Sequence, residues 1–180
     1  MSDITGSRIA FLLTNGVEQP ELTQPWEDLT KAGGKPVLVS PESGSITAMK
    51  GDWEHADSFD VDVEVKDADP DEYDALVLPG GTLNADALRI DADAVAFVKA
   101  FFDADKPVAS ICHGPWILID AGVASGRTMT SYTSIVPDLK NAGVTWVDEE
   151  VCIDGNLITS RNPGDLDAFG EALIDKLAQR

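Results

Sequence analysis

Residues 106–122 read KPVASICHGPWILIDAG, and this stretch decides the fold. The apolar run that ends at Ile111 predicts a buried strand. A helix is predicted to begin at about Pro115, within a few residues of the strand. Cys112 and His113 fall in the sharp turn between the two elements. A strand that turns at once into a helix is the repeating unit of sheets covered by helices.

Strands and helices alternate on both sides of this turn. Short apolar runs predict strands, and apolar residues at helical spacing predict helices. The predicted strands cover residues 8–15, 36–41, 74–81 and 106–111, the helices 21–34, 91–105 and 163–180, and hairpins 43–65 and 144–161. This order predicts a single α/β domain over residues 1–180, with a mostly parallel, flavodoxin-like sheet flanked by helices on both faces. Ligands of such folds bind beyond the carboxyl ends of the strands.

The composition is that of a folded enzyme-sized domain. The chain has 180 residues, of which 43% are hydrophobic and 25% charged, and its net charge is −19. Such a charge disfavours binding to nucleic acid, because the phosphates would be repelled. The sequence has no signal-peptide pattern and no run long enough to span a membrane, so a cytoplasmic protein is expected. Two cysteines and two histidines suit neither a disulfide scaffold nor a Cys/His zinc cluster.

Cys112 can be interpreted in two ways. A lone cysteine after an apolar strand is more often a small core residue than a nucleophile. Cys112, however, lies in the turn itself and is followed at once by His113. A thiol placed there, as in the nucleophile elbow of α/β hydrolases, faces the amide end of a helix, which is expected to lower its pKa.

Several motifs together resemble the PfpI-type intracellular peptidase and deglycase family, which lies within the class I glutamine amidotransferase-like superfamily. They are IAFLLTNGVEQPEL (9–22), DALVLPGG (74–81), ASICHGPWILIDAG (109–122), GRTMTSY (126–132) and NAGVTWVDEEVCIDGNLITSRNPGDL (141–166). The resemblance extends over essentially the whole chain. It implies a cysteine nucleophile at Cys112 and no cofactor. A glutaminase is disfavoured, because no histidine follows His113.

The resemblance also implies an acidic partner for the cysteine, which we assign to Glu18. Glu18 follows the first predicted strand and would reach the same edge of the sheet as Cys112. A carboxyl beside a thiolate tends to keep its proton and can donate it. Glu18 could instead only cap or solvate a loop. Glu21 is the nearest rival and is expected in the first turn of the following helix.

A third acid and an oxyanion site are implied as well. The family places an acid from a neighbouring subunit near the histidine, and Asp86 is the candidate here, although GGTLNADALRID (80–91) departs from the family in length. Asp86 is about as compatible with a helix-capping role at the surface. Backbone N–H groups of Gly80, Gly81 and His113 are expected to form the oxyanion site.

The implied function is cysteine chemistry on an electrophilic carbon. The candidate reactions act on reactive-carbonyl adducts, as a deglycase or glutathione-independent glyoxalase of the stress response, or on peptides. A small carbonyl needs only a compact site, which favours the first class. The alternative is a redox-sensing stress protein or holdase chaperone in which Cys112 is oxidised with little turnover. The expected partners are small carbonyl compounds, glycated proteins or peptides, and further copies of the chain, as a dimer or higher and possibly a hexamer.

Overall fold

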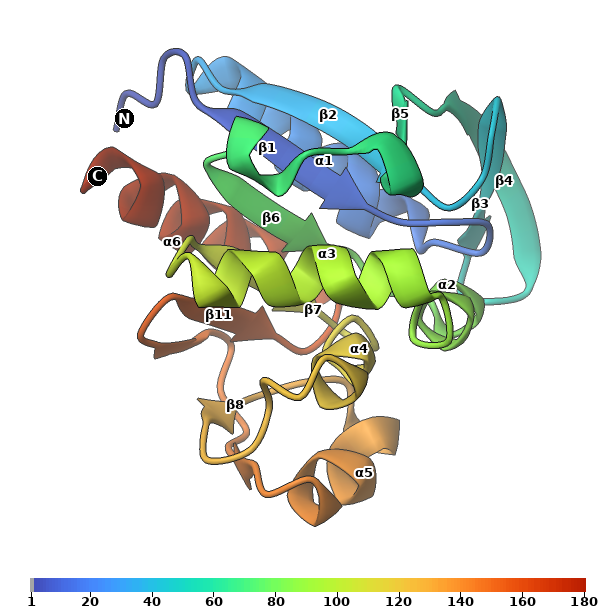
Figure 1. Cartoon of the computed structure of the whole chain (residues 1–180). Coiled ribbons are helices and arrows are strands. Elements are labelled where there is room, and N and C mark those ends of the chain that lie inside the picture. Colours follow the sequence, from blue (N-terminus) through green and yellow to red (C-terminus); the bar gives the residue numbers. More distant parts are fainter. Residues whose placement is uncertain (1) are drawn as a thin grey trace.

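A seven-stranded sheet forms the centre of the protein, in the order β10-β11-β7-β6-β1-β2-β5 (Figure 1). The computed structural model describes residues 2–180. The strands are β1 (Arg8–Leu12), β2 (Lys35–Ser40), β5 (Val63–Glu64), β6 (Ala75–Leu78), β7 (Val108–Ile111), β10 (Cys152–Asp154) and β11 (Leu157–Ser160). All neighbours pair in parallel except β10 and β11. The predicted α/β fold with a mostly parallel sheet is therefore confirmed.

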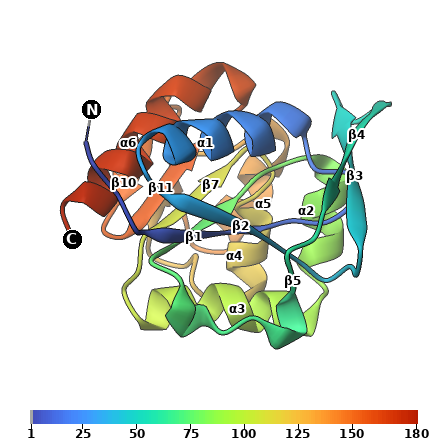
Figure 2. The same ribbon diagram turned by 90° about the horizontal axis from the view of Figure 1, so that it is seen from above.

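Helices cover both faces of this sheet, as Figure 2 shows from above. Helices α1 (Gln19–Lys31) and α6 (Leu166–Ala178) lie on one face, and α3 (Ala92–Asp103) lies on the other, with the shorter helices α4 (Trp116–Asp120) and α5 (Val136–Asn141). The helices explain why the central strands are apolar throughout, since neither face of the sheet meets water.

Strand β1 shows how this core is divided. Ile9 and Phe11 pack in the apolar cluster beneath α1 and α6, whereas Ala10 and Leu12 pack in the cluster beneath α3. Successive side chains of a strand point to opposite faces, so one apolar run supplies both clusters. All four residues are fully buried. The sheet is thereby fixed as a rigid platform whose carboxyl edge carries the functional residues.

Two small sheets complete the fold. The predicted hairpin at residues 43–65 is formed by β3 (Ser45–Lys50) and β4 (Glu54–Asp60). Its turn reaches back over the carboxyl edge of the main sheet. The second small sheet consists of β8 (Thr128–Met129) and β9 (Thr145–Trp146), which pair in parallel. The hairpin predicted within residues 144–161 is formed by the antiparallel strands β10 and β11.

The segment after β6 differs from its predicted form. Residues Thr82–Leu88, for which no helix was predicted, form helix α2 directly after the Gly80-Gly81 pair. Gly81 has φ 90°, which only glycine adopts readily, and this allows the abrupt change from strand to helix. Within residues 2–180, no helix is both long enough and apolar enough to cross a membrane.

Candidate active site

Cys112 occupies a strained turn at the carboxyl end of β7. Its φ of 62° lies in the left-handed region, which is uncommon for residues other than glycine, asparagine and aspartate. Two backbone hydrogen bonds hold it there: the Cys112 N–H donates to the Ser160 carbonyl at 3.1 Å, and the Tyr132 N–H donates to the Cys112 carbonyl at 2.9 Å. Strain of this kind persists only where surrounding contacts enforce it, and it is common at functional sites.

The segment that follows β6 comes very close to this turn at Gly80. A Cβ atom on Gly80 would lie 2.7 Å from the Cys112 Cβ and would also collide with the Glu21 carboxyl group. Only glycine therefore fits at this position. Because Gly80 follows β6 and Cys112 follows the neighbouring β7, the parallel pairing of the two strands places the glycine beside the cysteine, and the Glu21 carboxyl group of α1 reaches the same point.

Glu21 is the carboxylic acid beside the sulfur. Its side chain is fully buried, and Oε2 accepts the Gly80 N–H at 2.6 Å. Its Oε1 has no hydrogen-bond partner among residues 2–180, and the carboxyl group lies beside the Cys112 side chain. Burial raises the pKa of Glu21 to about 8. The carboxyl group therefore keeps its proton at neutral pH and can donate it to the sulfur.

The structure does not place Glu18 beside Cys112, which corrects the sequence-based assignment. Both carboxylate oxygens of Glu18 instead accept the Gly51 N–H, at 3.0 and 3.2 Å, in the turn of the β3–β4 hairpin. The reason lies in where α1 begins. Glu18 is the N-cap residue outside the helix, whereas Glu21 lies on the buried face of its first turn.

The predicted lowering of the Cys112 thiol pKa is wrong in direction. Cys112 is only 7% exposed, and this burial raises the thiol pKa, with the negative charge of an ionised Glu21 as the next cause. The backbone N–H groups of Gly81 and His113 act in the opposite sense. Helix α4, whose amide end was expected to lower this pKa, has only five residues and starts at Trp116. When Glu21 holds its proton, its repulsion is absent and its O–H stabilises the thiolate instead.

His113 contacts the sulfur directly, although neighbouring residues need not do so. The ring Nδ1 lies 3.2 Å from Cys112 Sγ, and Nε2 lies 3.0 Å from Ser134 Oγ and 3.3 Å from Thr82 Oγ1. The ring stacks on Tyr132 with centroids 4.7 Å apart. Burial, which leaves His113 only 5% exposed, lowers its pKa and favours the neutral imidazole. A neutral ring can accept the thiol proton.

Comparison with known proteins shows the family to which the chain belongs. The sequence profile of the DJ-1/PfpI family matches residues 7–176. The chain belongs to the DJ-1/PfpI family. It is 46% identical to "Deglycase PfpI" of Pyrococcus furiosus over 170 residues, which are 94% of this chain and 99% of that protein.

Solved structures agree with this membership. Drosophila melanogaster DJ-1beta superposes with a TM-score of 0.87 at 29% identity, covering 97% of this chain and 91% of that chain. A two-domain protein of Anabaena variabilis, with DJ-1/ThiJ/PfpI-like and ferritin-like domains, gives a TM-score of 0.89 at 34% identity, covering 95% of this chain and 48% of that chain.

The structure gives different surroundings to the other residues predicted for this site, which are the backbone groups of Gly80, Gly81 and His113 and the side chain of Asp86. The Gly81 and His113 N–H groups lie close enough to the sulfur to lower the thiol pKa, and their role in an oxyanion site stays a prediction. The Gly80 N–H instead donates to Glu21. Asp86 lies exposed on α2, and its side chain forms no hydrogen bond or ion pair within residues 2–180. Its role from a neighbouring subunit stays a prediction.

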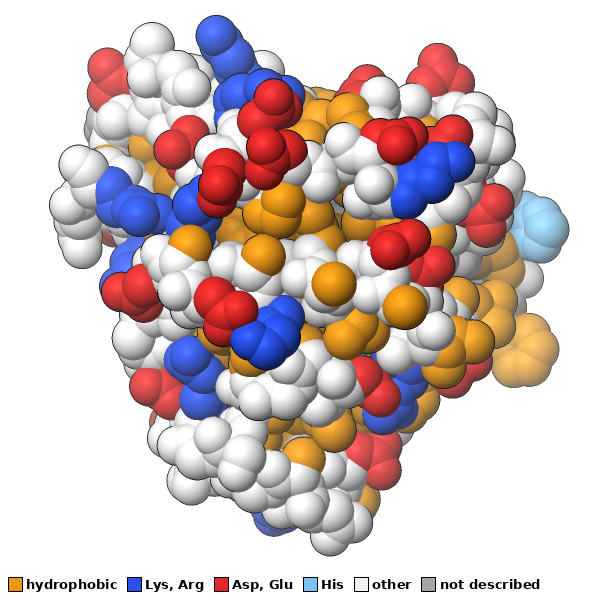
Figure 3. All heavy atoms as spheres, in the orientation of Figure 1, with side chains coloured by type: hydrophobic (Ala, Val, Ile, Leu, Met, Phe, Trp, Pro, Cys, Tyr) orange, Lys and Arg blue, Asp and Glu red, His pale blue; other side chains and the backbone are white. Residues whose placement is uncertain are grey.

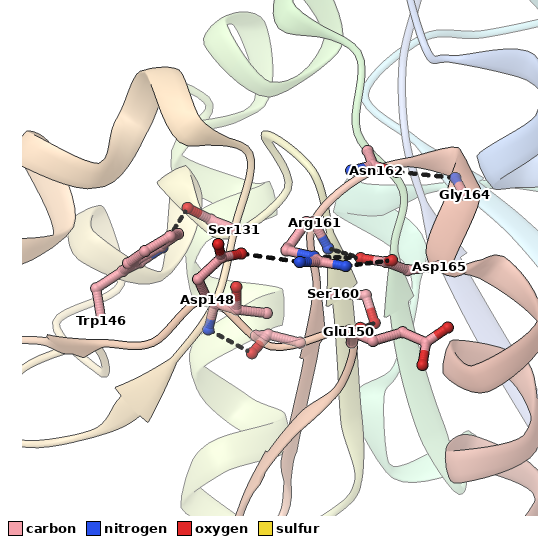
Figure 4. Close-up of polar contacts among 11 residues, drawn as sticks. Ser131, Trp146, Asp148, Glu150, Ser160, Arg161, Asn162, Gly164 and Asp165 are labelled. Atoms are coloured by element: carbon pink, nitrogen blue, oxygen red, sulfur yellow. Dashed lines mark hydrogen bonds and ion pairs between the residues drawn. The ribbon is translucent and has the colours of Figure 1, made fainter.

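A partly buried group of ion pairs supports the Cys112 turn from the side of β11 (Figure 4). Arg161 binds both carboxylate oxygens of the buried Asp165 at 2.9 Å and Asp148 at 2.8 Å. The neighbouring Ser160 donates its hydroxyl to the Glu150 carbonyl at 2.7 Å. Bidentate arginine–carboxylate pairs fix geometry strongly. They hold the chain at Ser160, whose carbonyl accepts the Cys112 N–H.

Sequence reasoning did not identify three polar residues around His113. Thr82, Ser134 and Asp52 come from α2, the segment before α5 and the hairpin turn. Thr82 bonds both to His113 and to Asp52. The one available signal was the position of Thr82 immediately after the Gly80-Gly81 pair, because a residue that follows a strand end lies at the ligand-binding edge.

Proposed function

We propose that the protein is a cysteine-dependent enzyme that acts on small reactive carbonyl compounds and their adducts, as a deglycase or glutathione-independent glyoxalase. The observation that carries this proposal is the position of one sulfur between a protonated acid and a neutral base. Glu21 lies on one side of Cys112, and His113 Nδ1 lies 3.2 Å away on the other. The similarity to "Deglycase PfpI" of Pyrococcus furiosus supports the same class.

Each group then has a defined task. His113 Nδ1 takes the thiol proton as the sulfur forms a bond to the aldehyde carbon, and the C=O π bond breaks. The new alkoxide oxygen receives the Glu21 proton, which gives a hemithioacetal. Backbone N–H groups of Gly81 and His113 stabilise negative charge at the reacting centre. The Glu21 carboxylate formed in this step is the base for proton transfers that follow.

Burial of the reacting groups supports a small substrate. Cys112 and His113 are only 7% and 5% exposed, and Tyr132 stacks over the histidine ring. A peptide bond in an extended substrate would need a cleft that admits both flanking segments, whereas an aldehyde needs space for a few atoms. We therefore favour carbonyl compounds over peptides.

Self-association, with Asp86 contributed to a neighbouring site, is part of this proposal. Three large apolar side chains near Asp86 are unusually exposed: Trp53 at 89%, Ile90 at 84% and Leu83 at 56%. Hydrophobic side chains gather over α2 and the adjoining hairpin end in Figure 3. Exposed apolar patches commonly mark contact surfaces. We expect sedimentation to give at least a dimer, which Trp53→Glu would weaken.

Consumption of methylglyoxal by the purified protein tests the main proposal. We expect turnover to an α-hydroxy acid by the wild type, loss of turnover in Cys112→Ala, and retention in Cys152→Ala, which removes the other thiol. Peptide hydrolysis should stay slow in all three. If the wild type consumes no carbonyl substrate, and mild peroxide instead converts Cys112 to a sulfinic acid detected by mass spectrometry, the redox-sensor function replaces the enzymatic one.

A further inference from the structure

A second acid reaches His113 from within the same chain. Thr82, the first residue of α2, donates its hydroxyl to Asp52 Oδ2 at 2.7 Å, and its N–H donates to Asp52 Oδ1 at 2.9 Å. The same hydroxyl oxygen lies 3.3 Å from His113 Nε2. Asp52 belongs to the turn of the β3–β4 hairpin and has φ 63°, a backbone conformation that aspartate tolerates better than most residues.

Counting protons fixes the direction of this chain of hydrogen bonds. A threonine hydroxyl has one proton and two lone pairs. Its proton is used on the Asp52 carboxylate, at the shorter of the two distances. Only a lone pair is then left for His113, so Nε2 must be the donor in that contact. The Ser134 hydroxyl, the other neighbour of Nε2, can act as donor or acceptor and therefore imposes no direction.

We propose that Asp52, acting through Thr82, is a positioning residue that keeps the His113 proton on Nε2 and so directs the Nδ1 lone pair at the Cys112 sulfur. The catalytic consequence rests on the proposed function, but the tautomer itself does not. A neutral histidine carries one ring proton, and the partner of one nitrogen decides which nitrogen carries it. With the proton on Nε2, Nδ1 at 3.2 Å from Sγ can accept the thiol proton.

The opposite tautomer would leave the sulfur without a base. Nδ1–H would then point at a sulfur that already receives N–H groups from Gly81 and His113 and the carboxyl group of Glu21. Asp52 sets the tautomer from within the same chain, on the Nε2 side of the ring, and this leaves the predicted place of Asp86 near a neighbouring histidine unchanged. Each subunit thus orients its own histidine.

Nitrogen NMR of the imidazole rings tests this directly, because the chain has only two histidines. His55→Gln removes the signal of His55 and thereby assigns His113. In the wild type above the His113 pKa, we expect ¹⁵N shifts of a protonated Nε2 and an unprotonated Nδ1. Thr82→Val should shift both resonances toward a tautomer mixture, whereas Thr82→Ser, which keeps the hydroxyl, should retain the wild-type shifts.

Variants of the acid complete the test. Asp52→Asn should move the two resonances in the same direction as Thr82→Val. Glu54→Gln, which removes an exposed carboxylate from the same hairpin, should leave them in place. In methylglyoxal turnover, we expect kcat to fall about tenfold in Thr82→Val with little change in KM, and Thr82→Ser to restore it.

A protonated Nδ1 in the wild type would overturn the proposal. So would wild-type tautomer shifts in a folded Thr82→Val protein, with folding checked by thermal unfolding. These outcomes are independent of turnover. A wild-type protein with the Nε2–H tautomer but no carbonyl consumption would overturn the proposed function and leave the positioning role of Asp52 standing.

Discussion

Both cysteines of this chain have a raised thiol pKa, but they lie in very different surroundings. Burial is the main cause that raises the thiol pKa of Cys112 and also that of Cys152. Cys152 lies in the edge strand β10, with regular strand geometry, and its sulfur contacts the Thr128 carbonyl at 3.5 Å. Cys112 lies in a left-handed turn between Glu21 and the His113 ring.

The difference shows that burial by itself does not distinguish the two cysteines. Desolvation opposes the thiolate at both positions. Only Cys112 has a neutral acid that can donate to the sulfur and a neutral base that can accept its proton. The reactivity proposed for Cys112 therefore depends on two groups that exchange protons with it, and removing those groups should make Cys112 resemble Cys152.

The largest effect we expect is on stability as a function of pH. Burial raises the pKa of Glu21 from 4.5 to about 8, so the folded state holds this proton more tightly than the unfolded state. The unfolding free energy should accordingly fall as pH rises through this window, by about 1.4 kcal/mol per pH unit from this group.

Urea unfolding from pH 5 to 8.5 measures this slope, and Glu21→Gln serves as the reference. The wild type minus Glu21→Gln difference isolates Glu21 from the many other acids of a chain with net charge −19. Cys152→Ser should keep the wild-type slope. Equal slopes in wild type and Glu21→Gln would contradict the protonated acid beside Cys112.

The next effect separates the two glutamates of the α1 segment. Glu21→Gln keeps the shape and the acceptor for the Gly80 N–H but loses the transferable proton, so kcat/KM for methylglyoxal should fall about 100-fold. Glu18→Gln weakens only a contact to Gly51 in the hairpin turn and should stay within about threefold of wild type. A larger loss in Glu18→Gln than in Glu21→Gln would restore the sequence-based assignment.

The smallest expected effect is a difference in stability between glycine and alanine variants at the two cysteine positions, which have different backbone conformations. At Cys112, with φ 62°, glycine relieves strain that alanine keeps, so Cys112→Gly should be more stable than Cys112→Ala by about 1 kcal/mol. At Cys152, inside a strand, the order should reverse by about 0.5–1 kcal/mol. Thermal unfolding of the four variants gives the comparison, and the same order at both positions would argue against strain at Cys112.

Much of the fold could be predicted because its signals are local. Apolar runs and helical spacing located the central strands, α1, α3 and α6, and the alternation of elements gave the parallel sheet. Helix α2 was missed, since it is short and follows a glycine pair that normally indicates a turn. Asp52 and Thr82 stand 30 positions apart, and no sequence pattern connects a hairpin turn to the start of a helix.

The choice between Glu18 and Glu21 shows where such reasoning ends. The two residues are three positions apart in the chain. Both come after β1, so either carboxyl group could lie at the carboxyl edge of the sheet. The start of α1 decided between them, because it left Glu18 outside the helix and turned Glu21 into the core. A shift of a few residues in a helix start exchanges which side chain is buried.

By itself, the sequence determined the order of strands and helices and put Cys112 and His113 in the turn after a buried strand, because these depend on residues close together in the chain. Tertiary structure decided which carboxyl group lies beside the sulfur and which polar groups surround the His113 ring. Those features depend on desolvation and hydrogen bonds among β7, the ends of β6 and β11, α1, α2 and the hairpin turn, which only packing brings within a few ångströms of one another.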